Sequence, residues 1–210
     1  MPLLEQRYGA EDFDLQRRET CYQGFFSFQR FYFKHKCFDG SWSELIQREV
    51  FVRGSATCAL PYDPRSDQVL LIEQFRVAAA LDSCSPWLIE LVAGINDKGE
   101  TPEDIARREA QEEAGIDLSH LEFICEYFPS PGACTEKVFL FCGVADLSQA
   151  GGVFGLPEEN EDILAHVMPF DEAVQLLHSG VINNAPAIMA IQWLQLNRQK
   201  MREEWNNEAD

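Results

Sequence analysis

The sequence has few basic residues for its length. Lys and Arg together number 17 in 210 residues, against 35 Asp and Glu, which gives a net charge of −18 and an isoelectric point of about 4.5. Such a surface repels phosphate backbones and anionic membranes, so we expect no binding to nucleic acid. An anionic substrate would need a metal ion or local arginines to be admitted.

Paired cysteines and long apolar runs are also missing. The seven cysteines are an odd number and form no Cys-x-x-Cys pair, which argues against a disulfide framework or a zinc site. No cationic start leads into an apolar core, and no apolar run approaches the ~18 residues of a membrane span. We therefore expect a soluble cytoplasmic protein with reduced thiols and no membrane partner.

The N-terminal quarter of the chain is rich in aromatic residues. Residues 1–17 show little pattern, but polar and apolar residues alternate over 29–35 and predict a strand. Asp39-Gly40 then indicates a hairpin turn before a second strand over 43–53. We interpret residues 1–54 as a β-rich unit, too small to bury a core well alone, that packs on the main domain or, as a dimerisation unit, on a second subunit.

The remainder, 55–210, predicts one α/β domain in which helices cover both sides of a mixed sheet. The expected helices lie at 102–114, 170–179 and 185–203. The expected strands are 56–61, 68–75, 86–92, 121–128, 137–146 and 163–168.

The helix at 102–114 carries the most informative residues. Thr101 suits the N-cap, Pro102 the first helical position and Gly115 the stop. Three carboxylates crowd one face and repel each other, which a hard divalent cation such as Mg²⁺ would relieve. A solvated acidic face is the alternative interpretation. The small residues Ala106, Ala110 and Ala114 define the packing face, and the carboxylates are Glu109, Glu112 and Glu113.

The spacing around this helix resembles the Nudix box, the signature of the Nudix hydrolase family. Gly94 is followed at the family's intervals by Glu100, Arg108-Glu109, Glu112-Glu113 and Gly115, and Ala110 stands where a bulkier aliphatic is common. The resemblance implies an α/β/α sandwich, with Arg108 orienting the glutamates. It implies metal ligation by Glu109, Glu112, Glu113 and the carbonyl of Ala93.

Two later segments refine this resemblance. Ser130-Pro131-Gly132 places a proline 131 − 115 = 16 residues after Gly115, as in the ADP-ribose pyrophosphatase subgroup, although Ala133 stands where a second glycine is usual. Alone, this segment would be read as a turn. The acidic loop 156–162 resembles one that supplies Glu159 as general base and Glu161 as a further metal ligand; a plain solvated loop is the alternative, and the base stays open among Glu158, Glu159 and Glu161.

Residues for substrate recognition also follow from the resemblance. Arg76, the backbone of Ile95 and Glu136 are expected to bind substrate. In similar enzymes the N-terminal unit is exchanged across a homodimer, so Phe25 and Arg48 would come from the partner subunit. For Phe25, a place in the core is an equal alternative.

The implied reaction is hydrolysis of ADP-ribose to AMP and ribose 5-phosphate, with Mg²⁺ as cofactor and Mn²⁺ as the alternative. A second hypothesis is cleavage of another sugar nucleotide, such as ADP-glucose or GDP-mannose. A third is a sensor that binds ADP-ribose without cleaving it. The presence of every box glutamate argues against the sensor: Glu100, Glu109, Glu112 and Glu113.

Overall fold

The computed structural model describes residues 5–81, 85–96, 99–156 and 160–207. The chain divides into two compact units. One holds the chain up to Gly54 together with the loop Phe128–Glu136, and the other holds Ser55–Tyr127 and the chain from Lys137 onward.

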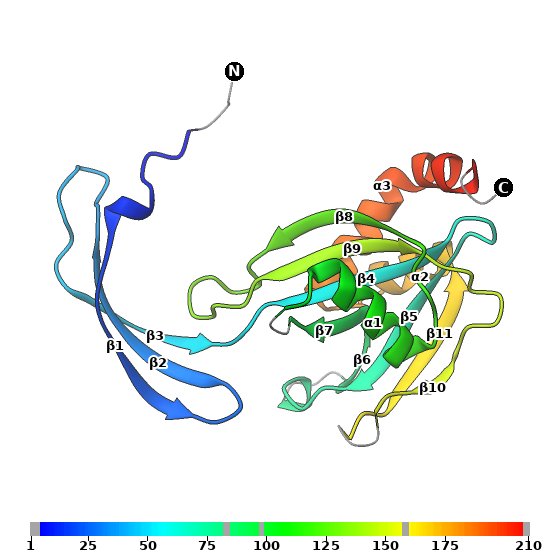
Figure 1. The fold of residues 1–210 in the computed structure, drawn as a ribbon, viewed down its shortest axis with the longest axis horizontal. Coiled ribbons are helices and arrows are strands. Elements are labelled where there is room, and N and C mark those ends of the chain that lie inside the picture. The colour runs from blue at the N-terminus through cyan, green and yellow to red at the C-terminus, as the bar shows by residue number, and fades with distance from the viewer. Residues whose placement is uncertain (1–4, 82–84, 97–98, 157–159, 208–210) are drawn as a thin grey trace. The chain divides into compact units, whose positions relative to one another are not determined.

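The first unit is an antiparallel three-stranded sheet in the order β1-β2-β3 (Figure 1). The expected hairpin is present, because β2 (Ser27–His35) pairs with β3 (Ile46–Val52) on either side of the turn at Asp39-Gly40. A short 3-10 helix (Ala10–Asp12) leads into β1 (Phe13–Gln23), which begins within the segment 1–17 where the sequence showed little pattern. Most of β1 is exposed, so no burial pattern marks it in the sequence.

The loop Phe128–Glu136 extends this small sheet. The amide of Phe51 donates to the carbonyl of Ala133 at 2.8 Å, and the amide of Thr135 donates to the carbonyl of Phe51 at 3.1 Å. The hydroxyl of Thr135 bonds to both the amide and the carbonyl of Arg53, at 3.0 and 2.9 Å. Residues far apart in the sequence are thereby fixed to one strand.

The second unit is built on an eight-stranded mixed sheet with the path β10-β11-β5-β4-β9-β8 (Figure 1). Strand β6 pairs with β5 and β7 pairs with β4, both antiparallel, whereas β4 and β9 are parallel. The strands are β4 (Ala56–Asp63), β5 (Gln68–Phe75), β6 (Trp87–Glu90), β7 (Val92–Ile95), β8 (His120–Tyr127), β9 (Val138–Val144), β10 (Gly152–Phe154) and β11 (Ile163–Pro169).

Helices cover both faces of this sheet, as the sequence predicts. Helix α1 (Pro102–Ala114) packs its alanine face on one side, with Ile72 and Phe141 of the sheet. Helices α2 (Phe170–His178) and α3 (Ala185–Asn207) pack on the other side around Tyr62 and Leu140. Burial of these two apolar layers, at roughly 25 cal/mol per Å², is the main stabilising contribution.

The sequence prediction was wrong in two places in this unit. A single strand at 86–92 is in fact β6 and β7, because the chain leaves β5 at Glu90 and joins β4 from Val92. The loop 148–162 contains the short strand β10. In the part of the chain that the structure describes, no helix is long and apolar enough to cross a membrane.

Candidate active site

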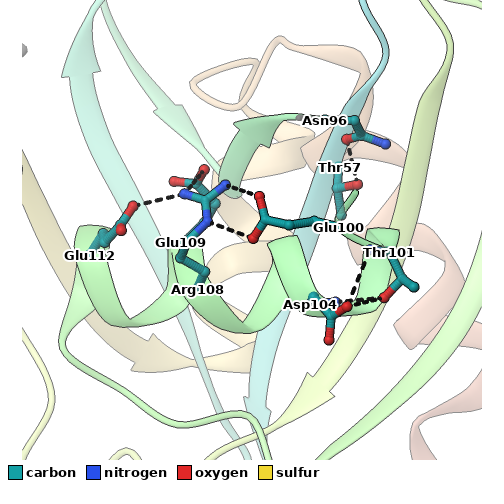
Figure 2. A network of polar contacts seen from close by, with 8 residues as sticks. All are labelled: Thr57, Asn96, Glu100, Thr101, Asp104, Arg108, Glu109 and Glu112. Atoms are coloured by element: carbon teal, nitrogen blue, oxygen red, sulfur yellow. Dashed lines mark hydrogen bonds and ion pairs between the residues drawn. The ribbon is translucent and has the colours of Figure 1, made fainter. Parts of the chain in front are cut away.

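Helix α1 begins and ends where its capping residues predict. The hydroxyl of Thr101 accepts a hydrogen bond from the amide of Asp104 at 3.2 Å, and the Asp104 carboxylate accepts from the Thr101 amide at 3.2 Å (Figure 2). At the other end Gly115 takes a left-handed conformation, with φ of 65°. These caps fix the register of the carboxylates along the helix.

Arg108 is the centre of the polar cluster on α1. Its Nη1 donates to Glu109 at 2.8 Å and to Glu112 at 3.0 Å, and its Nε donates to Glu100 at 3.1 Å (Figure 2). The Arg108 side chain is about one-third exposed. Burial lowers the pKa of Arg108, but the bond to Glu100 and the charges of Glu109 and Glu112 outweigh it and raise the pKa.

Glu113 and Glu109 are the unusual acids of the site. Glu113 is only 3% exposed, and burial, with repulsion from Glu109 and Glu161, raises its pKa to about 8 despite the hydrogen bond from the Ala93 amide. Burial likewise raises the pKa of Glu109 to about 7, against the opposing effect of Arg108. Carboxyls with raised pKa values are typical of functional sites, which makes this helix the candidate.

Strand β7 approaches α1 closely beside these acids. The amide of Ala93 donates to Glu113 at 2.8 Å. A Cβ atom added to Gly94 would lie 1.8 Å from Oε1 of Glu109 and 2.6 Å from its Cγ. A side chain at this position would therefore force the Glu109 carboxylate out of its observed place.

The donor chemistry of this cluster suits a hard divalent cation. Carboxylate oxygens are the ligands that Mg²⁺ prefers. Burial is the main cause of the raised pKa values of Glu109 and Glu113, with repulsion between the acids adding to it, and a bound cation would stabilise the charged form of both groups. Among the described residues, no three Asp, Glu, His or Cys side chains form a preformed metal cluster. Glu109 and Glu112 are instead bonded to Arg108, and Glu113 is bonded to Ala93.

Arg76 lies just after β5 and bonds to an acid that the sequence analysis did not single out. Its Nε and Nη2 donate to the carboxylate of Glu90, the Nη2 bond being 2.8 Å long. Burial lowers the pKa of Arg76, but Glu90, together with the charges of Glu113 and Glu161, outweighs it and raises the pKa. The structure thus brings Arg76 within electrostatic reach of the acids on and near α1.

The other expected residues of the second unit lie in strand β7 and in the acidic loop. Ile95 is the last residue of β7 and is 37% exposed. The carboxylate of Glu161 accepts a hydrogen bond from the amide of Leu156 at 3.3 Å. Glu158 and Glu159 lie outside the described residues, so the prediction of a general base among Glu158, Glu159 and Glu161 stays a prediction.

Three expected substrate-binding residues belong to the first unit. Phe25 is 86% exposed and packs edge-on against Phe26 with ring centroids 4.7 Å apart, so it is not a core residue within this chain. Arg48 on β3 donates to the carbonyl of Gln47 at 2.8 Å. Glu136 forms an ion pair of 3.0 Å with Arg53.

Sequence reasoning missed the roles of Glu90, Arg53 and the close contact at Gly94. Glu90 did carry a signal, because it is a lone acid in the apolar run 87–92, and a buried charge needs a partner. Arg53 carried none, because its partner Glu136 is remote in the sequence.

The fold and the site together define a class of protein: an α/β domain that presents carboxylates from one helix beside a glycine-containing strand. The NUDIX domain model matches residues 52–191. The chain therefore belongs to the NUDIX domain family.

Relatives named as pyrophosphatases are similar over most of the chain. An ADP-ribose pyrophosphatase from Haemophilus influenzae is 43% identical over 95% of this chain and 94% of its own. An ADP-ribose pyrophosphatase from Escherichia coli K12 is 44% identical over 96% and 97%. A GDP-mannose pyrophosphatase from Cronobacter sakazakii is 38% identical over 71% and 78%.

A solved structure described as an ADP compounds hydrolase shares the fold. It superposes with a TM-score of 0.70 at 18% identity, and the match covers 93% of this chain and 99% of that one.

Proposed function

We propose that this protein hydrolyses the diphosphate of ADP-ribose, giving AMP and ribose 5-phosphate. The observation that carries the proposal is 43–44% identity to ADP-ribose pyrophosphatases over nearly the full length of both chains. The crowded acids of α1 support it, since they provide the negative charge needed to hold a cation against a diphosphate.

The metal site that we propose uses the acids of α1. Glu109, Glu112 and Glu113, with Glu161 and the carbonyl of Ala93, would hold Mg²⁺ or Mn²⁺, whose charge lowers the pKa of a bound water and stabilises phosphate oxygens. Arg108 positions the glutamates through its hydrogen bonds to Glu109 and Glu112.

Residues other than Glu109, Glu112 and Glu113 carry out proton transfer and substrate recognition in this proposal. Glu159 takes the proton from the attacking water as general base. Arg76, the backbone of Ile95 and Glu136 recognise ADP-ribose, and a guanidinium suits the planar, two-point binding of a phosphate.

In this proposal the protein is a homodimer in the cytoplasm. The N-terminal unit of one subunit completes the active site of the other. The exposure of Phe25 supports the shared site. Its ring is 86% exposed, so covering it with a partner subunit or with substrate would remove a large apolar surface from water. Phe25→Ala should weaken ADP-ribose binding, whereas the equally exposed Leu196→Ala on α3 should not. If the protein sediments as a monomer in analytical ultracentrifugation and is fully active under the same conditions, a shared site is ruled out.

The test of function compares initial rates on ADP-ribose, ADP-glucose and GDP-mannose with MgCl₂ and with EDTA. ADP-ribose should be cleaved with the highest kcat/KM, and EDTA should abolish turnover. Glu113→Gln should remove activity, while Glu103→Gln, on the exposed first turn of the same helix, should keep it. A rate preference for GDP-mannose would transfer the assignment to the activity named for the Cronobacter relative.

Absence of turnover has two distinct meanings. Calorimetric binding of ADP-ribose without cleavage would identify a sensor. If the protein neither binds nor cleaves ADP-ribose, both the ADP-ribose hydrolase and the sensor hypotheses are excluded.

A further inference from the structure

Arg76 is held at one edge by Glu90. The Glu90 carboxylate accepts hydrogen bonds from Nε of Arg76 at 3.1 and 3.3 Å and from Nη2 at 2.8 Å. Two-point binding of this kind fixes the plane of a guanidinium as well as its position. These bonds come from Nε and Nη2 and not from Nη1, which carries two further N–H donors.

Glu90 itself is well anchored. It ends β6 opposite Ile72 of β5, and its side chain is 15% exposed, against 44% for Arg76. Nε2 of Gln74, a residue that is 7% exposed, donates to the Glu90 carboxylate at 3.4 Å. The acid is therefore the rigid member of the pair, and the arginine is the member that reaches toward solvent.

Other acids compete for the same arginine. The negative charges of Glu113 and Glu161 also act on Arg76. A long, flexible arginine in this field would pair with whichever carboxylate lies nearest, and pairing with Glu113 or Glu161 would remove it from the substrate. Among the residues that the structure describes, Glu90 is the acid to which Arg76 is hydrogen-bonded, and no role in metal binding is assigned to it.

We propose that Glu90 is a positioning residue that holds Arg76 in the orientation needed to bind the diphosphate of the substrate. Gln74 supports Glu90 from the neighbouring strand. This inference rests on the proposed hydrolysis of a sugar nucleotide and adds a specific residue to substrate recognition.

The test is a double-mutant cycle on Glu90→Gln and Arg76→Ala. Loss of one charged two-point contact should raise KM for ADP-ribose roughly 10- to 100-fold in Glu90→Gln, with kcat changed less than about threefold. The inhibition constant of the non-hydrolysable α,β-methylene analogue of ADP-ribose should rise by the same factor as KM. In the Arg76→Ala background, Glu90→Gln should cause no further loss.

Glu73→Gln is the matched control. Glu73 lies on β5, and its carboxylate is 2.9 Å from Nε2 of His166 with an exposed fraction of 33%. Glu73→Gln therefore makes the same change at a hydrogen-bonded carboxylate whose partner is His166 and not Arg76. Its KM and kcat should equal those of the wild type. Thermal unfolding of all variants separates a local effect from a loss of fold.

The outcomes separate this inference from the proposed function. If the wild type is active and Glu90→Gln leaves KM unchanged, the inference about Glu90 fails while the proposed function stands. The same holds if Glu90→Gln raises KM by equal factors in the wild-type and Arg76→Ala backgrounds. If Glu90→Gln unfolds, Gln74→Ala must raise KM in its place, or the inference fails. A wild type without activity on any sugar nucleotide would overturn the function itself.

Discussion

The contact between Gly94 and Glu109 allows a sharp prediction about the substitution Gly94→Ala. The added methyl would lie 1.8 Å from Oε1, 2.3 Å from Cδ and 2.6 Å from Cγ of Glu109. Gly94 does not adopt a positive φ, so alanine introduces no backbone strain there. The perturbation therefore acts through the Glu109 side chain.

The magnitude follows from the geometry. Carbon atoms in ordinary contact are about 3.5–4.0 Å apart, so the Glu109 carboxyl must move by more than about 1 Å. A displacement of that size in a catalytic group can cost about 100-fold in rate. We expect kcat/KM for ADP-ribose to fall about 100-fold, and the free energy of unfolding to fall by about 1–2 kcal/mol from overpacking.

A second background tests whether Glu109 is the cause. Glu109→Ala removes all three clashing atoms, so adding Gly94→Ala to it should leave the free energy of unfolding unchanged. Chemical denaturation of the four proteins measures the coupling. Normal activity of Gly94→Ala, or an equal loss of stability in both backgrounds, would refute the reasoning.

Three further predictions concern stability. The pKa of Glu113 in the folded protein is about 8 against an ordinary value of 4.5, so in EDTA the folded protein keeps a proton that the unfolded chain releases. The free energy of unfolding should therefore fall from about pH 4.5 to pH 8, by up to roughly 5 kcal/mol. Saturating MgCl₂ should restore most of this loss at pH 8, and thermal unfolding measured across pH tests both statements. Partial burial raises the pKa of Asp67, but hydrogen bonds from Arg198 and Tyr62 outweigh burial and hold the pKa below its ordinary value. The stabilisation is therefore present above about pH 4 and is lost as pH falls. Asp67→Asn should lower the free energy of unfolding by about 1–3 kcal/mol at pH 7 in urea denaturation, and the difference from the wild type should shrink in acid. Ala110 is fully buried between α1 and the sheet, so Ala110→Leu should destabilise by about 1–3 kcal/mol and lower kcat, and an unchanged melting temperature would contradict that packing.

The features that the sequence predicts well are local ones. Thr101, Pro102 and Gly115 determine the ends of α1 through contacts within a few residues, and the alternation of 29–35 reflects one strand. Motif spacing located the acids of α1 for the same reason. These signals need no knowledge of the tertiary structure.

Pairings between distant residues could not be predicted. Asp67 is bonded to Arg198 of α3, and no pattern near Asp67 indicates so remote a partner. The ion pair of Arg53 with Glu136 depends on the loop Phe128–Glu136 joining β3. Strand β1 is exposed along most of its length, so it has no apolar alternation to reveal it.

The most direct test of the account is the reaction of purified protein with ADP-ribose and MgCl₂ in ¹⁸O-labelled water, with products weighed by mass spectrometry. The account predicts AMP and ribose 5-phosphate with one ¹⁸O atom on one of the two phosphates, and no reaction in Glu113→Gln. Label on AMP would locate the attack at the adenosyl phosphorus. Intact ADP-ribose after incubation with wild-type protein, or cleavage that persists in Glu113→Gln, would contradict it.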